Sequence, residues 1–162
     1  MNKQILVIDM VLVIGSLFAL AFIIGYARPL VIAPTNDYVT TNTSVLFSFE
    51  KADTILLDDN LEFNSPTVIS VTDNIIVNLQ PGIYYWKVVG ALSSEVRQFT
   101  ISSVIDLRLH DTGRGTYDVV NSGNIPLDVA VYDHGRYTGN MTLSVDDRVT
   151  AVDNKTYIGG QR

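Results

Sequence analysis

Hydrophobic and polar positions follow two different patterns along the chain, and the change falls near Pro29. From Met10 to Ala27 the sequence carries eighteen residues without a charged side chain. A helix of that length spans about 27 Å, close to the roughly 30 Å of hydrocarbon in a bilayer. The pattern predicts a membrane-spanning helix over residues 10–27, with Asp9 at one edge of the bilayer and Tyr26 and Arg28 at the other.

Two interpretations of this segment stay open, an uncleaved signal-anchor and a cleaved signal peptide. Lys3 supplies a short basic region, and residues 25–27 (Gly-Tyr-Ala) offer the small side chains that a signal peptidase prefers. The apolar run exceeds the roughly 7–15 residues of a typical signal-peptide core, which favours the anchor. We therefore expect a single-pass protein of the cell membrane, in contact with the lipid bilayer through residues 10–27, with the N-terminus inside and the rest outside.

After Pro29 the apolar residues come in short runs, rich in β-branched and aromatic side chains and separated by Asn, Asp, Gly and Pro. This pattern is typical of short strands joined by turns. A first set of predicted strands covers residues 30–33, 43–50, 53–57, 67–71, 75–79, 83–90 and 95–102. A second set covers residues 104–110, 115–121, 127–133, 136–145, 147–152 and 155–158. Many short strands without a further helix predict an all-β fold of sandwich type.

Alternation along the strands assigns the core. Lys87 should face water, so Tyr84, Trp86 and Val88 share the inward face of their strand. We interpret Trp86 as a core residue packed between two sheets. The same alternation directs five further side chains inward, and leaves Leu46 on the outer face: Val45, Phe47, Phe49, Phe99 and Ile101.

The run from Leu79 to Val88 reads Leu-Gln-Pro-Gly-Ile-Tyr-Tyr-Trp-Lys-Val, and a Phe-Thr-Ile strand follows at residues 99–101. Together they resemble the end of a fibronectin type III or related immunoglobulin-like domain. The resemblance covers residues 29–102 and implies an immunoglobulin/fibronectin III-like sandwich there, with Tyr84 as a tyrosine corner. Joined to the anchor of residues 1–28, it implies a membrane-anchored protein of a prokaryotic cell envelope, with an archaeal source as the narrower expectation.

Residues 103–162 form a second small β domain in this interpretation. A block of about 60 residues is shorter than the ~100 of a usual sandwich, so we expect it to be incomplete or to be completed by another strand. Its turn Asn121-Ser122-Gly123-Asn124 is similar to the Asn-x-Gly-Asn turn of bacterial and archaeal surface-adhesin modules. We expect Asn121, Gly123 and Asn124 to tolerate positive φ in the bend, and we expect this turn to lie near a contact with a partner.

The amino-acid composition argues against several classes of function. Eleven basic against 17 acidic residues give a net charge of −6, which argues against a nucleic-acid surface. The chain has no cysteine, which excludes disulfides, thiolate catalysis and cysteine zinc sites. Neither a phosphate-binding glycine loop nor a Gly-x-Ser-x-Gly elbow occurs.

The remaining polar residues give no catalytic arrangement. His110 and His134 each stand beside an aspartate, and we interpret both as turn residues at strand ends rather than metal ligands. Residues 58–60 (Asp-Asp-Asn) are interpreted as a polar hairpin tip rather than part of a calcium site. We therefore expect no enzyme activity, no metal and no cofactor.

Three Asn-x-Ser/Thr sequons begin at Asn42, Asn140 and Asn154. They are glycosylation acceptors if the chain reaches a glycosylating compartment or surface. Sequons also arise by chance in a chain rich in Asn and Thr, so both explanations stay open.

The leading hypothesis is a membrane-anchored extracytoplasmic β-sandwich protein with a structural or protein-interaction role at the cell envelope. Its partners would be other envelope or membrane proteins, or further copies of itself. Two alternatives stay open. One is a pilin-like filament subunit, although no Gly or Ala follows Lys3 to give the usual peptidase site. The other is a single-span accessory subunit of a membrane complex, since Gly15-x-x-x-Ala19 is a small-residue pattern for helix contact.

Overall fold

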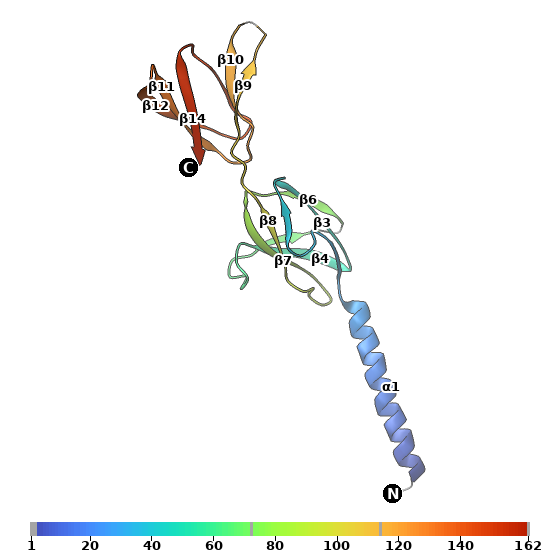
Figure 1. Cartoon of the computed structure of the whole chain (residues 1–162). Coiled ribbons are helices and arrows are strands. Elements are labelled where there is room, and N and C mark those ends of the chain that lie inside the picture. Colours follow the sequence, from blue (N-terminus) through green and yellow to red (C-terminus); the bar gives the residue numbers. More distant parts are fainter. Residues whose placement is uncertain (1–2, 72, 114, 162) are drawn as a thin grey trace. The chain divides into compact units, whose positions relative to one another are not determined.

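The computed structural model describes residues 3–71, 73–113 and 115–161 (Figure 1). It is mostly β, with one apolar helix, α1 (Lys3–Ala27), near the N-terminus. The helix begins seven residues before the predicted span because nothing in residues 3–9 breaks it. Asp9 consequently lies inside the helix rather than at its end. Pro29 follows the last helical turn, as expected for a residue that cannot continue a helix.

All elements after the helix, in the part of the chain that the structure describes, are strands. They are β1 (Leu30–Ala33), β2 (Tyr38–Thr40), β3 (Ser44–Glu50), β4 (Ala52–Asp58), β5 (Thr67–Ser70), β6 (Ile75–Asn78), β7 (Gly82–Gly90), β8 (Arg97–Ile101), β9 (Leu107–Asp111), β10 (Tyr117–Asn121), β11 (Leu127–Asp133), β12 (Arg136–Leu143), β13 (Arg148–Thr150) and β14 (Lys155–Gln161).

Each strand predicted from the sequence is confirmed, with ends that shift by a few residues. The strand β2 was not predicted from the sequence. This strand has only three residues and pairs in parallel with β8, Tyr38 opposite Phe99. Three residues are too few to display an alternating pattern, and a parallel pairing leaves no hairpin turn in the sequence to reveal it.

The strands form four sheets. One has five strands in the order β2-β8-β7-β4-β5, and three have three strands each: β1-β3-β6, β13-β10-β9 and β12-β11-β14. The chain divides into two compact units. The first contains Met1–Asn36, Leu46–Ile75 and Tyr84–Gln98, and the second contains Asp37–Val45, Ile76–Ile83 and Phe99–Arg162. This division interleaves segments, so the predicted domain boundary at residue 102 stays a prediction, as does the immunoglobulin-like type of the sandwich.

The predicted core of the first unit centres on Trp86. Its side chain is fully buried, and its ring meets the Phe47 ring edge-on, with centroids 4.8 Å apart and planes at 88°. Val88, two residues along the same strand, is also fully buried, whereas Tyr84 is half-buried. Phe47 and Phe49 of the first unit are buried as predicted, as are Val45, Phe99 and Ile101, which belong to the second unit. Leu46 is exposed, also as predicted. The alternation along β3, β7 and β8 therefore predicted the buried faces correctly.

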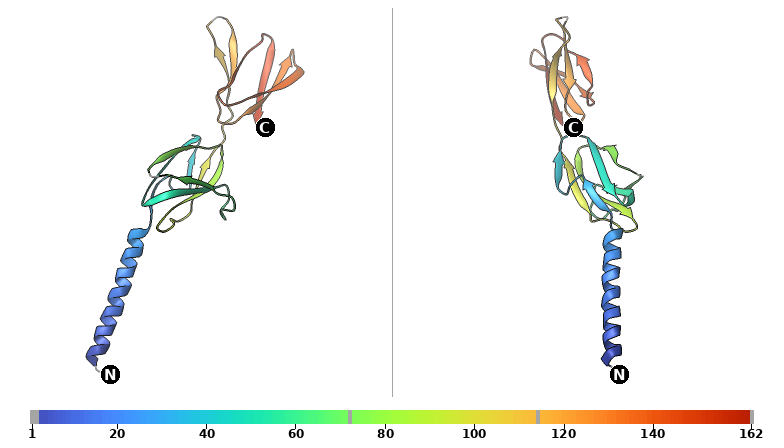
Figure 2. Two further views of the ribbon diagram at one scale, coloured as in Figure 1. Left: turned by 180° about the vertical axis from the view of Figure 1, so that it is seen from behind. Right: turned by 90° about the vertical axis from the view of Figure 1, so that its right-hand side faces the viewer.

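The second unit contains two three-stranded antiparallel sheets, β13-β10-β9 and β12-β11-β14. Figure 2 shows them as two layers, and Figure 1 shows the β9–β10 hairpin diverging from β14 toward its tip. A separate apolar core lies between the sheets and consists of Val119, Ile125, Leu127, Val129 and Leu143.

Candidate functional site: a groove beside β9 and a turn held by two asparagines

The predicted interaction turn contains a buried amide. The Asn121 side chain is fully buried at the end of β10. Its Nδ2 donates to the backbone carbonyls of Ile125 (2.8 Å), Leu143 (3.1 Å) and Ser144 (3.1 Å). Its Oδ1 accepts from the backbone N–H of Gly123 at 3.0 Å. This one side chain therefore ties β10 to the segments beside β11 and β12.

Gly123 and Asn124 hold the segment that precedes β9. Asn124 Oδ1 accepts from Val104 N–H (2.6 Å), and Asn124 Nδ2 donates to the carbonyls of Ser102 (2.9 Å) and Thr41 (2.8 Å). A Cβ on Gly123 would lie 2.2 Å from the Val104 carbonyl oxygen, so only glycine permits this close approach.

The expectation of positive φ in this turn is wrong. None of Asn121, Gly123 and Asn124 is among the described residues with positive φ. The bend is fixed by side-chain hydrogen bonds instead of by left-handed backbone. Ser122 is the exposed member of the turn. A partner contact at Asn121-Ser122-Gly123-Asn124 stays a prediction, and the structure adds an internal role for three of the four residues.

A groove of about 520 Å³ opens on the second unit, between β9–β10 and the segment that leads into β14. This volume falls within the roughly 300–1,000 Å³ of binding pockets. The lining combines apolar side chains, among them Leu107 and Leu109, with the charged residues Arg108, Asp153 and Lys155. Leu109 is 66% exposed. This groove was not predicted from the sequence, because residues 107–109 and 151–157 meet only in the folded unit.

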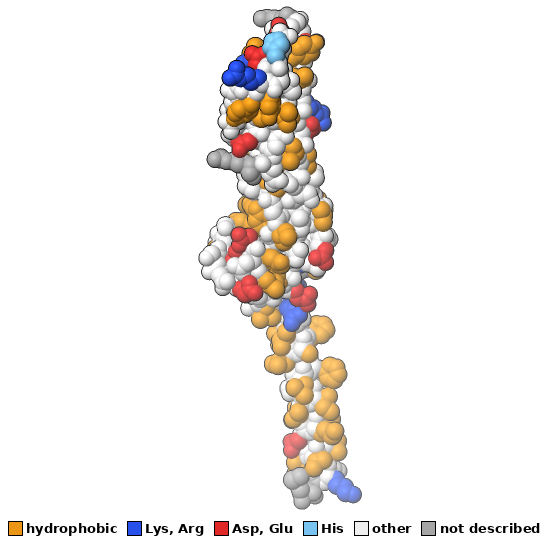
Figure 3. Space-filling model, turned by 60° about the vertical axis from the view of Figure 1, so that its left-hand side comes forward, with side chains coloured by type: hydrophobic (Ala, Val, Ile, Leu, Met, Phe, Trp, Pro, Cys, Tyr) orange, Lys and Arg blue, Asp and Glu red, His pale blue; other side chains and the backbone are white. Residues whose placement is uncertain are grey.

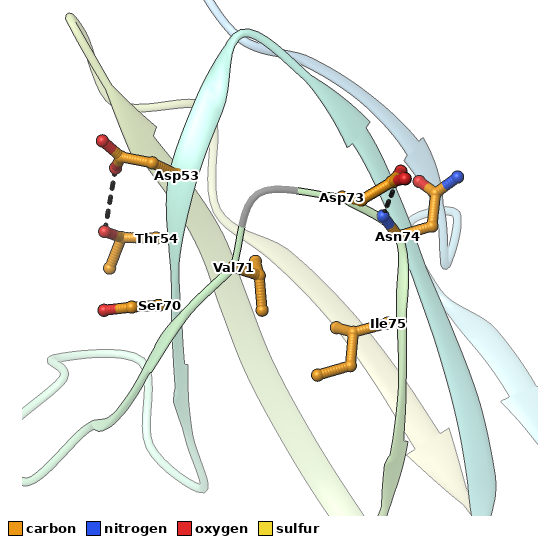
Figure 4. A pocket seen from close by; sticks show the side chains of 7 residues that line it. All are labelled: Asp53, Thr54, Ser70, Val71, Asp73, Asn74 and Ile75. Carbon is orange, nitrogen blue, oxygen red and sulfur yellow. Dashed lines mark hydrogen bonds between the residues drawn. The ribbon is translucent and has the colours of Figure 1, made fainter.

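A hollow of about 570 Å³ lies in the first unit, beside β4, β5 and β6. Figure 4 shows its two carboxylates, Asp53 and Asp73, on opposite sides, with Val71 and Ile75 between them. Asp53 accepts from the Thr54 hydroxyl (2.9 Å), and Asp73 accepts from the Asn74 backbone N–H (2.7 Å). The described residues contain no group of three or more potential metal ligands.

Asp58 organises the loop between β4 and β5. Its Oδ1 accepts from the backbone N–H of Asp59 (2.8 Å), and its Oδ2 accepts from that of Ser65 (3.1 Å). Burial alone would raise the pKa of Asp58, but the hydrogen bonds from Ser65, Asp59 and Asn60 outweigh it and lower the pKa below its ordinary value. Both carboxylate oxygens thus accept hydrogen bonds from backbone N–H groups of this loop.

The two histidines lie in different settings. His110 is exposed and lies one residue before the end of β9, so it is near a strand end as predicted, but it is a strand residue rather than a turn residue. His134 forms a two-residue turn with Gly135 between β11 and β12, where both have positive φ (49° and 79°), and its Nδ1 lies 2.5 Å from Asp133 Oδ1. Such a turn matches the twist of a hairpin and supports the interpretation of His134 as a turn residue.

The sequon asparagines are all exposed. Asn42 lies between β2 and β3, where its Oδ1 accepts from Ser44 N–H at 2.9 Å. Asn140 lies in β12, and Asn154 precedes β14 with φ of 65°. Glycosylation at these positions stays a prediction.

Comparisons with known proteins identify no family. No family model matches the sequence, and no curated protein is recognisably similar to it. Among solved structures, the CupB2 chaperone of Pseudomonas aeruginosa aligns with 11% identity over 80% of this chain and 98% of that chain. The TM-score is 0.23, so this alignment carries no argument about fold or function.

Proposed function

We propose that this chain is a membrane-anchored extracytoplasmic β protein that acts through protein contacts at a cell envelope. The observation that carries the proposal is α1. It is 25 residues long, about 37 Å at 1.5 Å per residue, and none of its side chains is buried. Figure 3 shows hydrophobic side chains along the visible face of this helix. Water is a poor solvent for so much apolar surface, and a bilayer is a good one.

The end of the helix has the residues expected at a membrane interface. Lys51 Nζ donates to the Tyr26 carbonyl (3.1 Å) and lies 4.1 Å from the centroid of the Tyr26 ring. A cation at a helix C-terminus complements the helix dipole, and aromatic and basic residues anchor helices at headgroups. With Arg28, these residues support an interface at the C-terminal end of α1.

The β part supports binding better than catalysis. Asp58 and Asp73 accept hydrogen bonds from the backbone, and the second unit has a groove that is partly lined by apolar side chains such as Leu109. We therefore propose a non-enzymatic role that needs no cofactor, in which residues 103–162 meet a partner protein.

A specific observation favours one second candidate, the single-span accessory subunit. A Cβ built on Gly15 meets nothing within 4 Å, so the small-residue face of Gly15 and Ala19 is open to another helix. In this case α1 would bind a second transmembrane helix in addition to lipid.

Native size after mild detergent extraction tests these proposals. We expect the chain to leave the membrane only with detergent and to migrate as one chain in its micelle. Co-migration with other membrane proteins that Gly15→Leu abolishes would instead establish the accessory subunit. Release of the chain as long polymers by mechanical shear would contradict both and favour a filament.

A further inference from the structure

Asp9 lies within the apolar part of α1. Four large apolar residues, Ile5 to Ile8, precede it, and each has at least half of its surface exposed. From Ile5 to Ala27 no other residue carries a charge. If the bilayer ended at Asp9, a full helical turn of apolar side chains would stand among headgroups or in water, which is unfavourable. The sequence of α1 therefore favours a position of Asp9 inside the hydrocarbon.

The length of the apolar run gives the depth of the carboxylate. Residues 5–27 extend about 34 Å along the axis, and a helix tilted by the average ~20° fits this length into a hydrocarbon layer of roughly 30 Å. The Cα of Asp9 then lies about 6 Å inside one end of the run, since four residues precede it. Lysine and arginine reach headgroups on long stems, whereas aspartate has a single methylene group. An ionisable residue at this depth typically faces another helix or a water-filled cavity instead of lipid.

The helix offers Asp9 no counter-charge. Lys3 is the other charged residue of α1, and it lies six residues earlier, about 9 Å along the axis and about 120° around it. Among the described residues, no ion pair or hydrogen bond joins the Asp9 side chain to another group. Arg28 and Lys51 belong to the opposite end of the helix, where Lys51 contacts Tyr26. By itself, α1 therefore leaves the carboxylate unpaired.

Apart from Tyr26 near its end, the apolar run has one further polar side chain, Ser16, and it lies on the same face as Asp9. Spacings of four and three residues align one stripe along a helix. This Asp9 stripe consists of Asp9, Val13, Ser16, Leu20 and Ile23. The Ser16 hydroxyl donates to the Val13 carbonyl at 2.8 Å, so its donor is satisfied inside the helix. The Asp9 carboxylate is thus the group on this stripe that lacks a partner.

A second copy of α1 fits the Asp9 stripe poorly. Two copies in the same orientation would place Asp9 beside Asp9, and like charges repel most strongly in a medium of low dielectric constant. An opposite charge at the same depth would be attracted strongly for the same reason. Ionisable residues within bilayers commonly pair with one another in this way. Charge complementarity therefore favours a basic partner.

We propose that the Asp9 stripe binds the transmembrane helix of a partner protein, which carries a lysine or arginine at the depth of Asp9. The assignment rests on the membrane span of the proposed function and deepens it, because it names a surface of α1 and the chemistry that this surface recognises. Interhelical polar contacts in membranes are individually modest. Such a pair forms at the high effective concentration of a bilayer and dissociates on dilution into detergent, which agrees with the single-chain migration expected above.

Disulfide cross-linking in phosphatidylcholine vesicles tests the proposal. The full chain has no cysteine, so a single introduced cysteine reports one position. The probe is a synthetic transmembrane helix of leucine and alanine, with one lysine at the depth of Asp9 and one cysteine a turn further in. We expect Val13→Cys, on the Asp9 stripe, to cross-link to this probe about three to ten times more than to a probe with leucine in place of lysine. Val11→Cys, on the opposite face, is the matched control and should cross-link weakly with both probes.

Further variants of the Val13→Cys chain separate charge from shape. Asp9→Asn keeps the size of the side chain and removes the charge, so it should abolish the preference for the lysine probe. Asp9→Lys should reverse the preference, in favour of a probe with aspartate at that depth. Ser16→Ala changes the same stripe but removes no free donor, and it should leave the preference unchanged.

Three results would overturn the assignment. Equal cross-linking of Val13→Cys to the lysine and leucine probes would mean that Asp9 reaches the headgroups and needs no partner. Cross-linking of Val13→Cys chains to one another, in equal yield with and without the probe, would mean that a second copy covers the stripe. Equal yields from Val13→Cys and Val11→Cys would mean that the contact has no preferred face. In all three cases the chain still floats with the vesicles, whereas a chain that does not float would contradict the membrane span and this inference with it.

Discussion

The two units have buried centres of opposite chemistry. Trp86 in the first unit is fully buried against Phe47, and no hydrogen-bond partner for its indole Nε1 lies among the described residues. Asn121 in the second unit is equally buried, but its amide makes four hydrogen bonds. The first centre depends on shape and apolar contact, and the second depends on polar bonds to the backbone.

The side chains that surround the two centres differ. Large aromatic side chains contribute to the first centre, whereas the core of the second is aliphatic and small: Val119, Ile125, Leu127, Val129 and Leu143. A single amide that holds three carbonyls fixes the loops around such a core. Because a satisfied buried polar group becomes costly once its partners are lost, we expect Asn121 to be nearly as important to folding as Trp86.

The largest effect should come from Trp86→Ala. Removing a buried indole leaves a cavity, so we expect the free energy of unfolding to fall by ~3–5 kcal/mol. Chemical denaturation of the full chain in detergent, followed by circular dichroism, measures it. Trp86→Phe should cost much less, because the indole N–H has no partner to lose. An equal loss of unfolding free energy in Trp86→Ala and Trp86→Phe would show that the indole N–H contributes to stability. It would contradict the contrast between an apolar centre at Trp86 and a polar centre at Asn121.

The next effect should come from Asn121→Ala. It leaves the N–H of Gly123 and the carbonyls of Ile125, Leu143 and Ser144 short of a partner, and we expect a loss of about 2–4 kcal/mol. Ser122→Ala, on the adjacent exposed residue, is the control and should change stability by less than about 0.5 kcal/mol. If both variants unfold like the wild-type chain, the second unit does not depend on its buried amide.

A smaller effect is expected at Asn124. Asn124→Ala frees the Val104 N–H and the carbonyls of Ser102 and Thr41, which are closer to solvent, and should cost about 1–2 kcal/mol. Amide exchange should then accelerate at Val104, which is bonded to Asn124 Oδ1, and remain unchanged in the β11–β12 hairpin. Uniform acceleration across the second unit would instead give Asn124 the same role as Asn121.

The smallest effect should be a pH dependence from Asp58. Its folded-state pKa is lowered, so its contribution to stability is present above the unfolded pKa of about 3.9 and is lost as pH falls through the folded value. Asp58→Asn should reduce the loss of stability below about pH 4. Glu95→Gln, on an exposed side chain, is the control. An acid transition identical in wild type and Asp58→Asn would contradict the role of this carboxylate in its loop.

The sequence predicted local features well and long-range ones poorly. Alternation placed Phe47, Trp86 and Phe99 in the interior, because a strand's two faces repeat every two residues. It could not place Asn121 there, since its partners at residues 125, 143 and 144 meet it only after β11 and β12 have folded. The short second block predicted that residues 103–162 need another strand, but the sequence could not assign the free edge to β9, because strand order, unlike strand position, has no local signal.

The most direct test of the central claim is the state of α1 in the mature protein. Membranes that contain the full chain are washed with alkaline carbonate, and the mass of the retained chain is measured. The account predicts that the chain stays with the bilayer and that its mass includes residues 10–27. A chain that the wash releases, with a mass that begins at Arg28, would contradict the anchor and leave a secreted β protein.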